Sequence, residues 1–294
     1  MTTTRPYRTR PYRDHRDLRA MQTLTTRLWS PTAPYHVGDL AWGRLLDPTA
    51  DWPITLWEHH GHVVAWAWAH LPDDLRLQID PAHPALLPTI LDWFAALTHG
   101  EPHEISVLDS EHHIADALIR RGYRPLPDDA PFFALHERDL HHLPTPTLPD
   151  GYTARAVHGP ADHPRRVAVH QAAWNSRRLT TDAYRTLTRT WPYRPDLDWI
   201  IEAPDGDFAA SCLLWHDPAH HVGLIEPVGT HPAHRRHGLA RAVCLAALHA
   251  LADAGATRAI VSPRGDAAYP VPQALYRQIG FRPYDRTRSW RHDG

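Results

Sequence analysis

The sequence predicts a mixed α/β protein built from two tandem domains. Three observations lead to this prediction. The chain has 294 residues, of which 43% are hydrophobic, whereas a typical domain needs only about 150 residues. A proline-rich segment lies near the middle of the chain, and strand-like and helix-like patterns alternate in each half. We therefore expect a first domain at 1–140, a linker at 141–150 and a second domain at 151–294.

The expected linker lies within the stretch LHHLPTPTLPDG, at 140–151. Its prolines, Pro144, Pro146 and Pro149, favour an extended and semi-rigid connector. The two halves that it separates have similar lengths and contain four short echoes in the same order. These pairs are 7–10 with 152–155, 57–72 with 199–218, 79–84 with 230–235, and 121–125 with 279–283. Four echoes in register indicate a duplicated domain.

Each half is expected to contain strand, helix, helix, three strands, helix, strand, helix and strand. In the second half, the turn at Gly206 predicts a hairpin. Apolar residues at helical spacing predict a long helix, and Gly255 marks its end. The expected elements are strands at 199–203, 208–215 and 221–230, a helix at 239–254, a strand at 257–261 and a helix at 272–279.

The loop before the long helix has the features of an anion site. The free backbone N–H groups in the first turn of a helix attract anions. Gly238 would let a phosphate approach the backbone closely, and Ala240 is small for the same reason. Arg235, Arg236 and Arg241 add positive charge. This combination predicts a pyrophosphate-binding loop.

These residues resemble the acyl-CoA-binding motif of the Gcn5-related N-acetyltransferase (GNAT) superfamily, which is Arg/Gln-x-x-Gly-x-Gly/Ala after a strand. Arg235, Gly238 and Ala240 fill that pattern, and ALYRQIGF at 274–281 resembles the closing helix and strand of the family. The paired halves resemble the tandem acetyltransferases, of which the mycothiol synthase-like proteins are one type. The resemblance implies two GNAT-like domains, each with a mostly antiparallel central sheet and flanking helices.

The resemblance also implies acetyl-CoA as co-substrate and no metal. The backbone of the fourth strand of the domain would contact the pantetheine arm, and Gly229 is expected to mark a bulge that splays this strand from the next. The expected cofactor-binding residues are Val228, Gly229, Thr230, Arg235, Arg236, His237, Gly238, Leu239, Ala240 and Arg241.

Two catalytic residues follow from the resemblance. Tyr276 matches the tyrosine that protonates the leaving thiolate, and Glu226 matches a carboxylate that takes the amine proton. If no bulge shifts the phase of the strand, Glu226, Val228 and Thr230 share one face. The alternatives are a tyrosine packed under the sheet and a structural glutamate at the start of a strand.

The chain departs from the family pattern in two places. Tyr269, followed by two prolines, stands where the family often has an asparagine, so the contact of that asparagine to the cofactor is in doubt. The first half has Leu87 where Gly238 would lie, and Pro84 and Pro88 flank it. We therefore expect the first domain to keep the fold, to lack the cofactor site and to help wall the acceptor pocket. Trp174 and Trp191 are further candidates for that pocket.

Composition excludes several partners. The net charge of −2 gives no basic field for nucleic acid or an anionic membrane. Cys212 and Cys244 form no Cys-x-x-Cys pair, and the N-terminal segment has no apolar run, so a cytoplasmic protein is expected. His231, His234 and His237 recur every third residue. They are interpreted as polar loop residues and not as metal ligands.

The predicted function is transfer of an acetyl group from acetyl-CoA to a primary amine by direct attack in a ternary complex. The acceptor, a small-molecule or peptide amine, is not specified by the sequence, and a monomer and a homodimer both fit. The alternative is a non-catalytic acyl-CoA-binding sensor or scaffold module.

Overall fold

The computed structural model describes residues 7–46, 52–72 and 74–294. The first half contains β1 (Arg8–Pro11), α1 (His15–Leu28), α2 (Val37–Leu46), β2 (Ile54–His59), β3 (His62–His70), β4 (Asp74–Ile79), α3 (Leu86–Thr98), β5 (His103–Leu108), α4 (His112–Arg120), β6 (Arg124–Pro125) and β7 (Ala134–Asp139). The second half contains β8 (Thr153–Ala156), α5 (His163–Trp174), α6 (Thr181–Leu187), η1 (Pro195–Leu197), β9 (Asp198–Glu202), β10 (Phe208–Asp217), β11 (Val222–Thr230), η2 (Pro232–His234), α7 (Leu239–Asp253), β12 (Arg258–Val261), α8 (Pro270–Gln278) and β13 (Arg282–His292).

Apart from the two-residue strand β6 and the short helices η1 and η2, these elements follow the order expected from the sequence, and the fold is mixed α/β. One sheet has the strand order β1-β2-β3-β4, and the other has the order β5-β13-β7-β12-β11-β10-β9-β8. All neighbouring pairs are antiparallel except β11 and β12, which are parallel. The hairpin of β9 and β10, the strand β11 and the helix α7 lie within a few residues of their predicted bounds.

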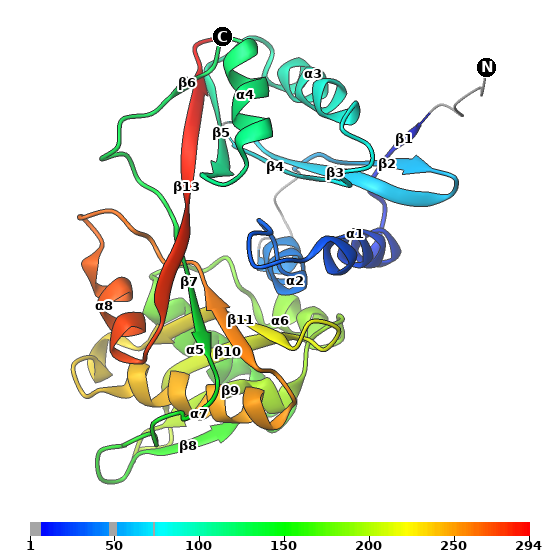
Figure 1. Cartoon of the computed structure of the whole chain (residues 1–294). Coiled ribbons are helices and arrows are strands. Elements are labelled where there is room, and N and C mark those ends of the chain that lie inside the picture. Colours follow the sequence, from blue (N-terminus) through cyan, green and yellow to red (C-terminus); the bar gives the residue numbers. More distant parts are fainter. Residues whose placement is uncertain (1–6, 47–51, 73) are drawn as a thin grey trace.

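The two halves exchange their last strands. β7 is the last strand of the first half in sequence but pairs with β12 and with the beginning of β13. The rest of β13, the last strand of the chain, pairs with β5 and β6 of the first half. Figure 1 shows β13 running from the lower to the upper part of the molecule and joining them. The proline-rich linker therefore separates the halves in sequence, while the strand pairing crosses that boundary in both directions.

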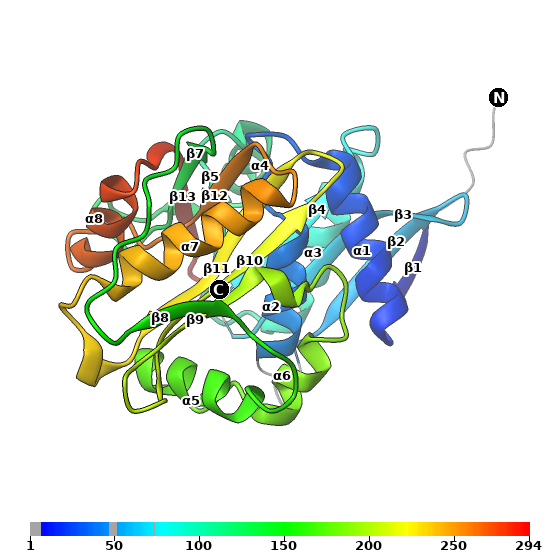
Figure 2. The ribbon, with the colours of Figure 1, turned by 90° about the horizontal axis from the view of Figure 1, so that it is seen from below.

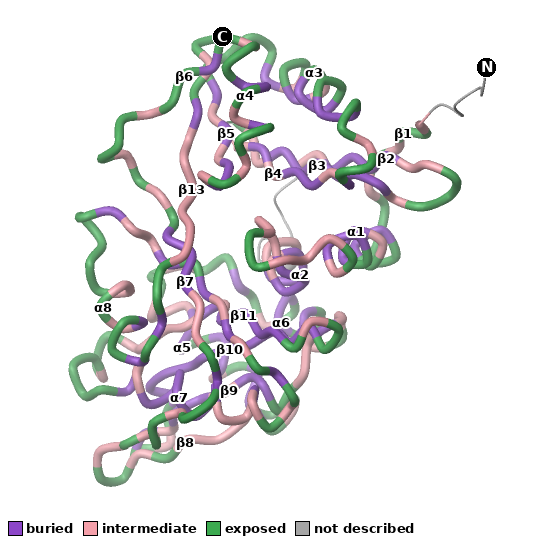
Figure 3. The backbone as a smooth tube through the Cα atoms, viewed as in Figure 1, coloured by how far each residue is buried: buried purple, intermediate pink, exposed green. Residues whose placement is uncertain are grey.

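The sheet of the second half is covered on both faces. Alternating side chains of β10 point to opposite faces, because successive residues of a strand do so. Cys212 and Leu214 pack against α7, whereas Leu213 and Trp215 pack against α5, α6 and α2. Figure 2 shows α7 on one side of β10 and β11 and α5 on the other, and Figure 3 shows that these strands are largely buried.

Helix α2 lies between the two halves, with the first sheet above it and β10 and β11 below it in Figure 1. Its Leu40 joins the core of the first sheet, and its Trp42 joins the core beside Trp215. A Cβ on Gly38 would lie 2.3 Å from Cγ of Trp215, so only glycine allows this close approach. The helix is therefore fixed against the second half while it belongs to the first.

Among the described residues, no helix is both long enough and apolar enough to cross a membrane.

Candidate active site

The parallel pair of β11 and β12 opens after three residues. Val222, Gly223 and Leu224 pair with β12, but the rest of β11, from Ile225 to Thr230, has no ladder partner on that side among the described strands. On its other side, β11 stays paired with β10 through Thr230. The open edge exposes backbone hydrogen-bonding groups to any extended ligand that enters between the two strands.

The loop before α7 presents a row of free amides beside that opening. Arg236 and Gly238 both have positive φ, at +68° and +75°. Successive N–H groups in such a loop point to one side and form an anion-binding concavity. In the described structure, the amides from 236 to 241 donate to no protein acceptor. A Cβ on Gly238 would meet nothing within 4 Å, so open space faces the helix start.

The basic residues of the loop do not all have the same surroundings. Arg235 is exposed, and its Nη2 donates to the carbonyl of Ala173 at the end of α5 over 3.1 Å. Arg235 therefore ties the loop to α5 in addition to contributing charge. Arg236 and His237 are exposed, and Arg241 is half-buried in the first turn of α7. The Thr230 hydroxyl is buried without a hydrogen-bond partner among the described residues.

The bulge in β11 is not at Gly229, which corrects the sequence-based expectation. The register between β10 and β11 shifts between Val228 and Ile225, so Glu226 and Pro227 together face the single residue Leu213. Gly229 instead gives room to α5, because a Cβ there would lie 2.6 Å from Cβ of Ala173.

The bulge also changes which side chains of β11 share a face. Val228 packs against the core beside α7, whereas the carboxyl of Glu226 interacts with Trp42 of α2 on the other face. Glu226, Val228 and Thr230 therefore do not form one row. Glu226 points toward the junction between the halves, and this direction bears on its role.

Glu226 is half-buried, and different residues contact its backbone and its side chain. The indole N–H of Trp215 donates to the Glu226 carbonyl over 2.7 Å. Burial raises the pKa of the Glu226 carboxyl to about 7, and the negative charge of Asp39 adds to this rise. Arg76 and the indole of Trp42 oppose it. A carboxyl with a pKa near neutrality is suited to accept and release protons at physiological pH.

Tyr276, on α8, is buried beside α7 and packs edge-on against Phe281, with ring centroids 5.7 Å apart. Burial raises the pKa of its hydroxyl well above the usual range, with contributions from Cys244, Cys212 and Glu226. The hydroxyl thus stays protonated at neutral pH. It makes no hydrogen bond to a described residue, so it is free to donate to a ligand.

The segment before α8 differs from its expected form. The helix begins at Pro270 and not near Pro272, with both prolines in the first turn, where proline is tolerated. Tyr269 precedes the helix and is exposed, and the guanidinium of Arg264 lies over its ring. No asparagine occupies this position to reach a ligand.

The loop before α3 in the first half corresponds to the loop before α7, but most of its amides are already used. The amides of Leu86 and Leu87 donate to the carbonyls of His83 and Pro84, and Pro88 has no N–H group. The first turn of α3 therefore offers few free donors to a phosphate. Behind it lies a cavity of about 690 Å³ between β4, α3, α4 and the segment after α1, with a mixed lining of apolar residues and of polar or charged residues that include Asp80, Glu111 and Arg120.

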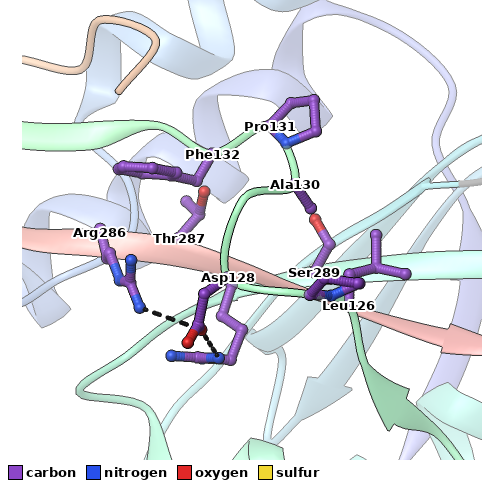
Figure 4. A pocket seen from close by; sticks show the side chains of 10 residues that line it. Leu126, Asp128, Ala130, Pro131, Phe132, Arg286, Thr287 and Ser289 are labelled. Carbon is purple, nitrogen blue, oxygen red and sulfur yellow. Dashed lines mark hydrogen bonds and ion pairs between the residues drawn. The ribbon is translucent and has the colours of Figure 1, made fainter. Parts of the chain in front are cut away.

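A smaller pocket lies where the loop before β7 passes β13. Figure 4 shows Phe132, Asp128 and Arg286 around it, with ion pairs from Asp128 to arginines of β13. Its volume is about 20 Å³, which is room for about one water molecule. The ion pairs around the pocket hold β13 beside this loop, and the pocket is too small for a cofactor.

Two of the three loop histidines make hydrogen-bonding contacts within the protein, and the ring of His237 lies edge-on to Tyr152 with centroids 6.4 Å apart. The amide of Ala233 donates to Nδ1 of His231 over 3.2 Å, and the hydroxyl of Tyr152 lies 3.0 Å from Nδ1 of His234. These contacts fit the interpretation of His231, His234 and His237 as polar loop residues.

Of the two tryptophan candidates, one lies beside β11. The Nε1 atom of Trp174 would be 3.4 Å from a Cβ on Gly229, and its side chain is exposed. Trp191 instead lies under the guanidinium of Arg19 on α1, 3.5 Å from its ring centroid. Trp191 therefore holds the halves together.

Sequence reasoning missed three residues that lie around Glu226. They are Asp39 and Trp42 on α2 and Arg76 on β4, all from the first half. No local pattern marks them, because each is brought to Glu226 by the packing of one half on the other.

Comparisons with known proteins agree with this geometry. The model described as "Acetyltransferase (GNAT) family" matches residues 166–281, which include β11, the loop, α7 and α8. The match to the GNAT acetyltransferase family thus covers most of the second half of the chain. Mycothiol acetyltransferase of Tsukamurella paurometabola is 30% identical over 161 residues. That match covers 51% of this chain and 54% of the relative, so it spans about half the length of each.

Solved structures resemble the whole chain in fold. A tandem GNAT protein from the clavulanic acid biosynthesis pathway, solved without acetyl-CoA, aligns over 98% of both chains with a TM-score of 0.67 and 15% identity. A GCN5-related N-acetyltransferase from Sphaerobacter thermophilus aligns over 97% of this chain and 95% of its own, with a TM-score of 0.63 and 17% identity. Both halves of this chain therefore share their arrangement with solved GNAT structures.

Proposed function

We propose that the protein is an N-acetyltransferase that transfers an acetyl group from acetyl-CoA to a primary amine. The observation that carries the proposal is the row of free amides before α7, beside the open edge of β11. In this proposal, the amides of residues 236–241 bind the pyrophosphate, and Arg235, Arg236 and Arg241 supply positive charge. The backbone of Val228, Gly229 and Thr230 binds the pantetheine arm, and no metal takes part.

The proposed reaction is a direct attack within a ternary complex. The amine nitrogen bonds to the thioester carbonyl carbon, and the carbon–sulfur bond then breaks. Glu226 takes the proton that the amine loses, and Tyr276 gives its hydroxyl proton to the departing sulfur. The products are an N-acetyl amine and CoA with a free thiol. Solvent then returns a proton to Tyr276 and removes one from Glu226. Holding both reactants in place supplies much of the rate.

The test is release of the CoA thiol from acetyl-CoA in the presence of a panel of primary amines. We expect amine-dependent release, and we expect Tyr276→Phe to lower kcat by about 10²-fold, which is the size of a general-acid contribution. Its unfolding free energy should change little, because the hydroxyl has no hydrogen-bond partner among the described residues. Acetyl-CoA that binds tightly but is turned over with none of the amines would instead indicate a non-catalytic sensor or scaffold.

A further inference from the structure

Charged residues of both signs from the first half lie on the acceptor side of the proposed site. The first half carries neither of the proposed catalytic residues. Asp39 and Arg76 of the first half surround Glu226 of the second. We call the meeting point of α2, β4 and β11 at Asp39, Trp42, Arg76 and Glu226 the α2 junction. Both carboxyls have their pKa raised by burial, and the positive charge of Arg76 opposes the rise in each. Arg76 therefore lies within electrostatic range of both.

The register of the first sheet fixes the side on which Arg76 lies. Arg76 is paired with Trp68 across β3 and β4, and Gln78 lies two residues further along the same face. The Gln78 side chain accepts a hydrogen bond from Thr25 of α1 over 2.6 Å, so this face is the one covered by α1 and α2. The guanidinium of Arg76 consequently points toward α2 and not toward α3.

Helix α2 holds the two sides of the junction together. Asp39, Trp42 and Gly43 are three and four residues apart, so they share one face of the helix. A Cβ on Gly43 would lie 3.4 Å from both Nη1 of Arg76 and the ring of Trp68, and the guanidinium carbon lies 6.0 Å from the centroid of that ring. Trp42 meets Glu226 from the same face. One rigid helix thus sets the spacing between Arg76 and Glu226.

The charges face one another without closing into ion pairs. Arg76 lies more than 4.0 Å from the carboxyl oxygens of both Asp39 and Glu226, and its ion pair within that limit is a long contact of 3.9 Å to Asp74. The side chain of Arg76 is 38% exposed, so solvent reaches it. A guanidinium presents a planar fork of donors that matches a carboxylate. A ligand that has both an amine and an anion would offer a partner to each of these charges.

We propose that Arg76 determines acceptor specificity by binding a carboxylate on the acceptor, so that the preferred substrates are amines that also carry a carboxylate, as α-amino acids do. This inference rests on the proposed acetyl transfer. The acceptor amine faces Glu226 and Asp39, and the carboxylate of the same molecule pairs with Arg76 across the α2 junction. The first half thereby contributes directly to substrate recognition.

The test compares each common amino acid with two matched compounds, its decarboxylated amine and its amide, as acceptors for acetyl-CoA. We expect kcat/KM to be highest for the compound with the free carboxylate. Arg76→Gln, which keeps the packing on Trp68, should raise KM for that compound roughly ten- to hundredfold, the effect of losing a charge-assisted contact. KM for acetyl-CoA and for the decarboxylated amine should stay within about twofold of the original values.

Two further variants sharpen the result. Arg76→Lys keeps the charge without the planar fork, so its KM for the amino acid should lie between those of the original protein and Arg76→Gln. Arg8 provides the matched control, because it lies on the same sheet and makes an ion pair of the same length, 3.9 Å, to Glu58. Arg8→Gln should leave every KM unchanged.

The outcomes separate this inference from the proposed function. If decarboxylated amines are acetylated as well as amino acids, or if Arg76→Gln weakens both classes equally, the carboxylate assignment is wrong and acetyl transfer stands. If no amine of any class releases CoA, the proposed function fails and the inference fails with it.

Discussion

Glu226 combines a half-buried position with a carboxyl that must lose its proton to act as a base. Burial raises its folded pKa to about 7 from an ordinary value of 4.5. The neutral form is therefore the one that the folded protein favours. Its contribution to stability is fully present below about pH 4.5 and is lost as pH rises through 7. The same burial that makes Glu226 a candidate base at neutral pH makes its ionised form costly.

Replacement of Glu226 by glutamine should therefore separate activity from stability. We expect the original protein to gain kcat/KM as pH rises through about 7, the pKa of Glu226. Glu226→Gln should lack that rise and be slower by about 10²-fold above it. The variant cannot ionise, so above pH 8 it should be more stable by an amount on the order of 3 kcal/mol, with no difference near pH 4. Rate profiles and denaturant unfolding across pH measure both effects, and an unchanged rate profile would rule out the base role.

The residues of the site differ in how far the sequence could predict them. Arg235, Gly238 and Ala240 form one loop, so their spacing along the chain was enough to propose an anion site there. Asp39 and Arg76 come within range of Glu226 only through packing between the halves. The direction of the Glu226 side chain depends on a bulge at Glu226 and Pro227, where the strand periodicity breaks. A prediction that assumes regular alternation of side chains along a strand cannot locate the bulge at which that alternation breaks.

At the scale of elements, α7 allows a direct test of the loop, because glycines of similar conformation lie at both of its ends. Gly238 precedes the helix with φ of +75°, and Gly255 follows it with φ of +95°. A Cβ on either would meet nothing within 4 Å. An alanine at either position should cost about 1–2 kcal/mol of stability from the left-handed backbone.

Only one of these two substitutions should affect cofactor binding. We expect Gly238→Ala to raise KM for acetyl-CoA roughly tenfold, because the added methyl group and the strain disturb the amides that face the pyrophosphate. Gly255→Ala, at the opposite end of α7, should leave that KM unchanged. Steady-state kinetics at saturating acceptor compares them. Equal effects of the two alanines on KM would show that the loop at Gly238 has no special part in binding.

The bounds of individual elements were predictable, whereas their pairing was not. The helix α7 and the strands β9 to β12 lie within a few residues of the predicted ranges, since apolar periodicity and turn residues are local signals. β7 and β13 also have ordinary strand patterns. Those patterns do not specify which neighbour a strand will choose, so the exchange between the halves became visible only in the three-dimensional structure.

At the scale of the whole molecule, the exchange means that neither half holds a complete sheet. Without β7, the fragment 151–294 would leave β12 unpaired on one side and separate it from β13. Unpaired strand edges of this kind promote aggregation. Without β13, the fragment 1–150 would lose the strand that joins β5 and β6 to the larger sheet. The helix α2 adds a second dependence, because it fills the face of the second half beside Trp215.

We therefore expect the fragment 151–294 to be unable to fold alone, although it contains the entire proposed cofactor site. Expressed by itself, it should be insoluble or show no cooperative unfolding, and it should not bind acetyl-CoA. Mixed or co-expressed with the fragment 1–150, it should recover a soluble complex that binds acetyl-CoA, because β7 and α2 then complete its sheet and core. Calorimetry of acetyl-CoA binding to each fragment and to the complex measures this directly. A fragment 151–294 that folds and binds acetyl-CoA without its partner would show that the exchanged strand is not required.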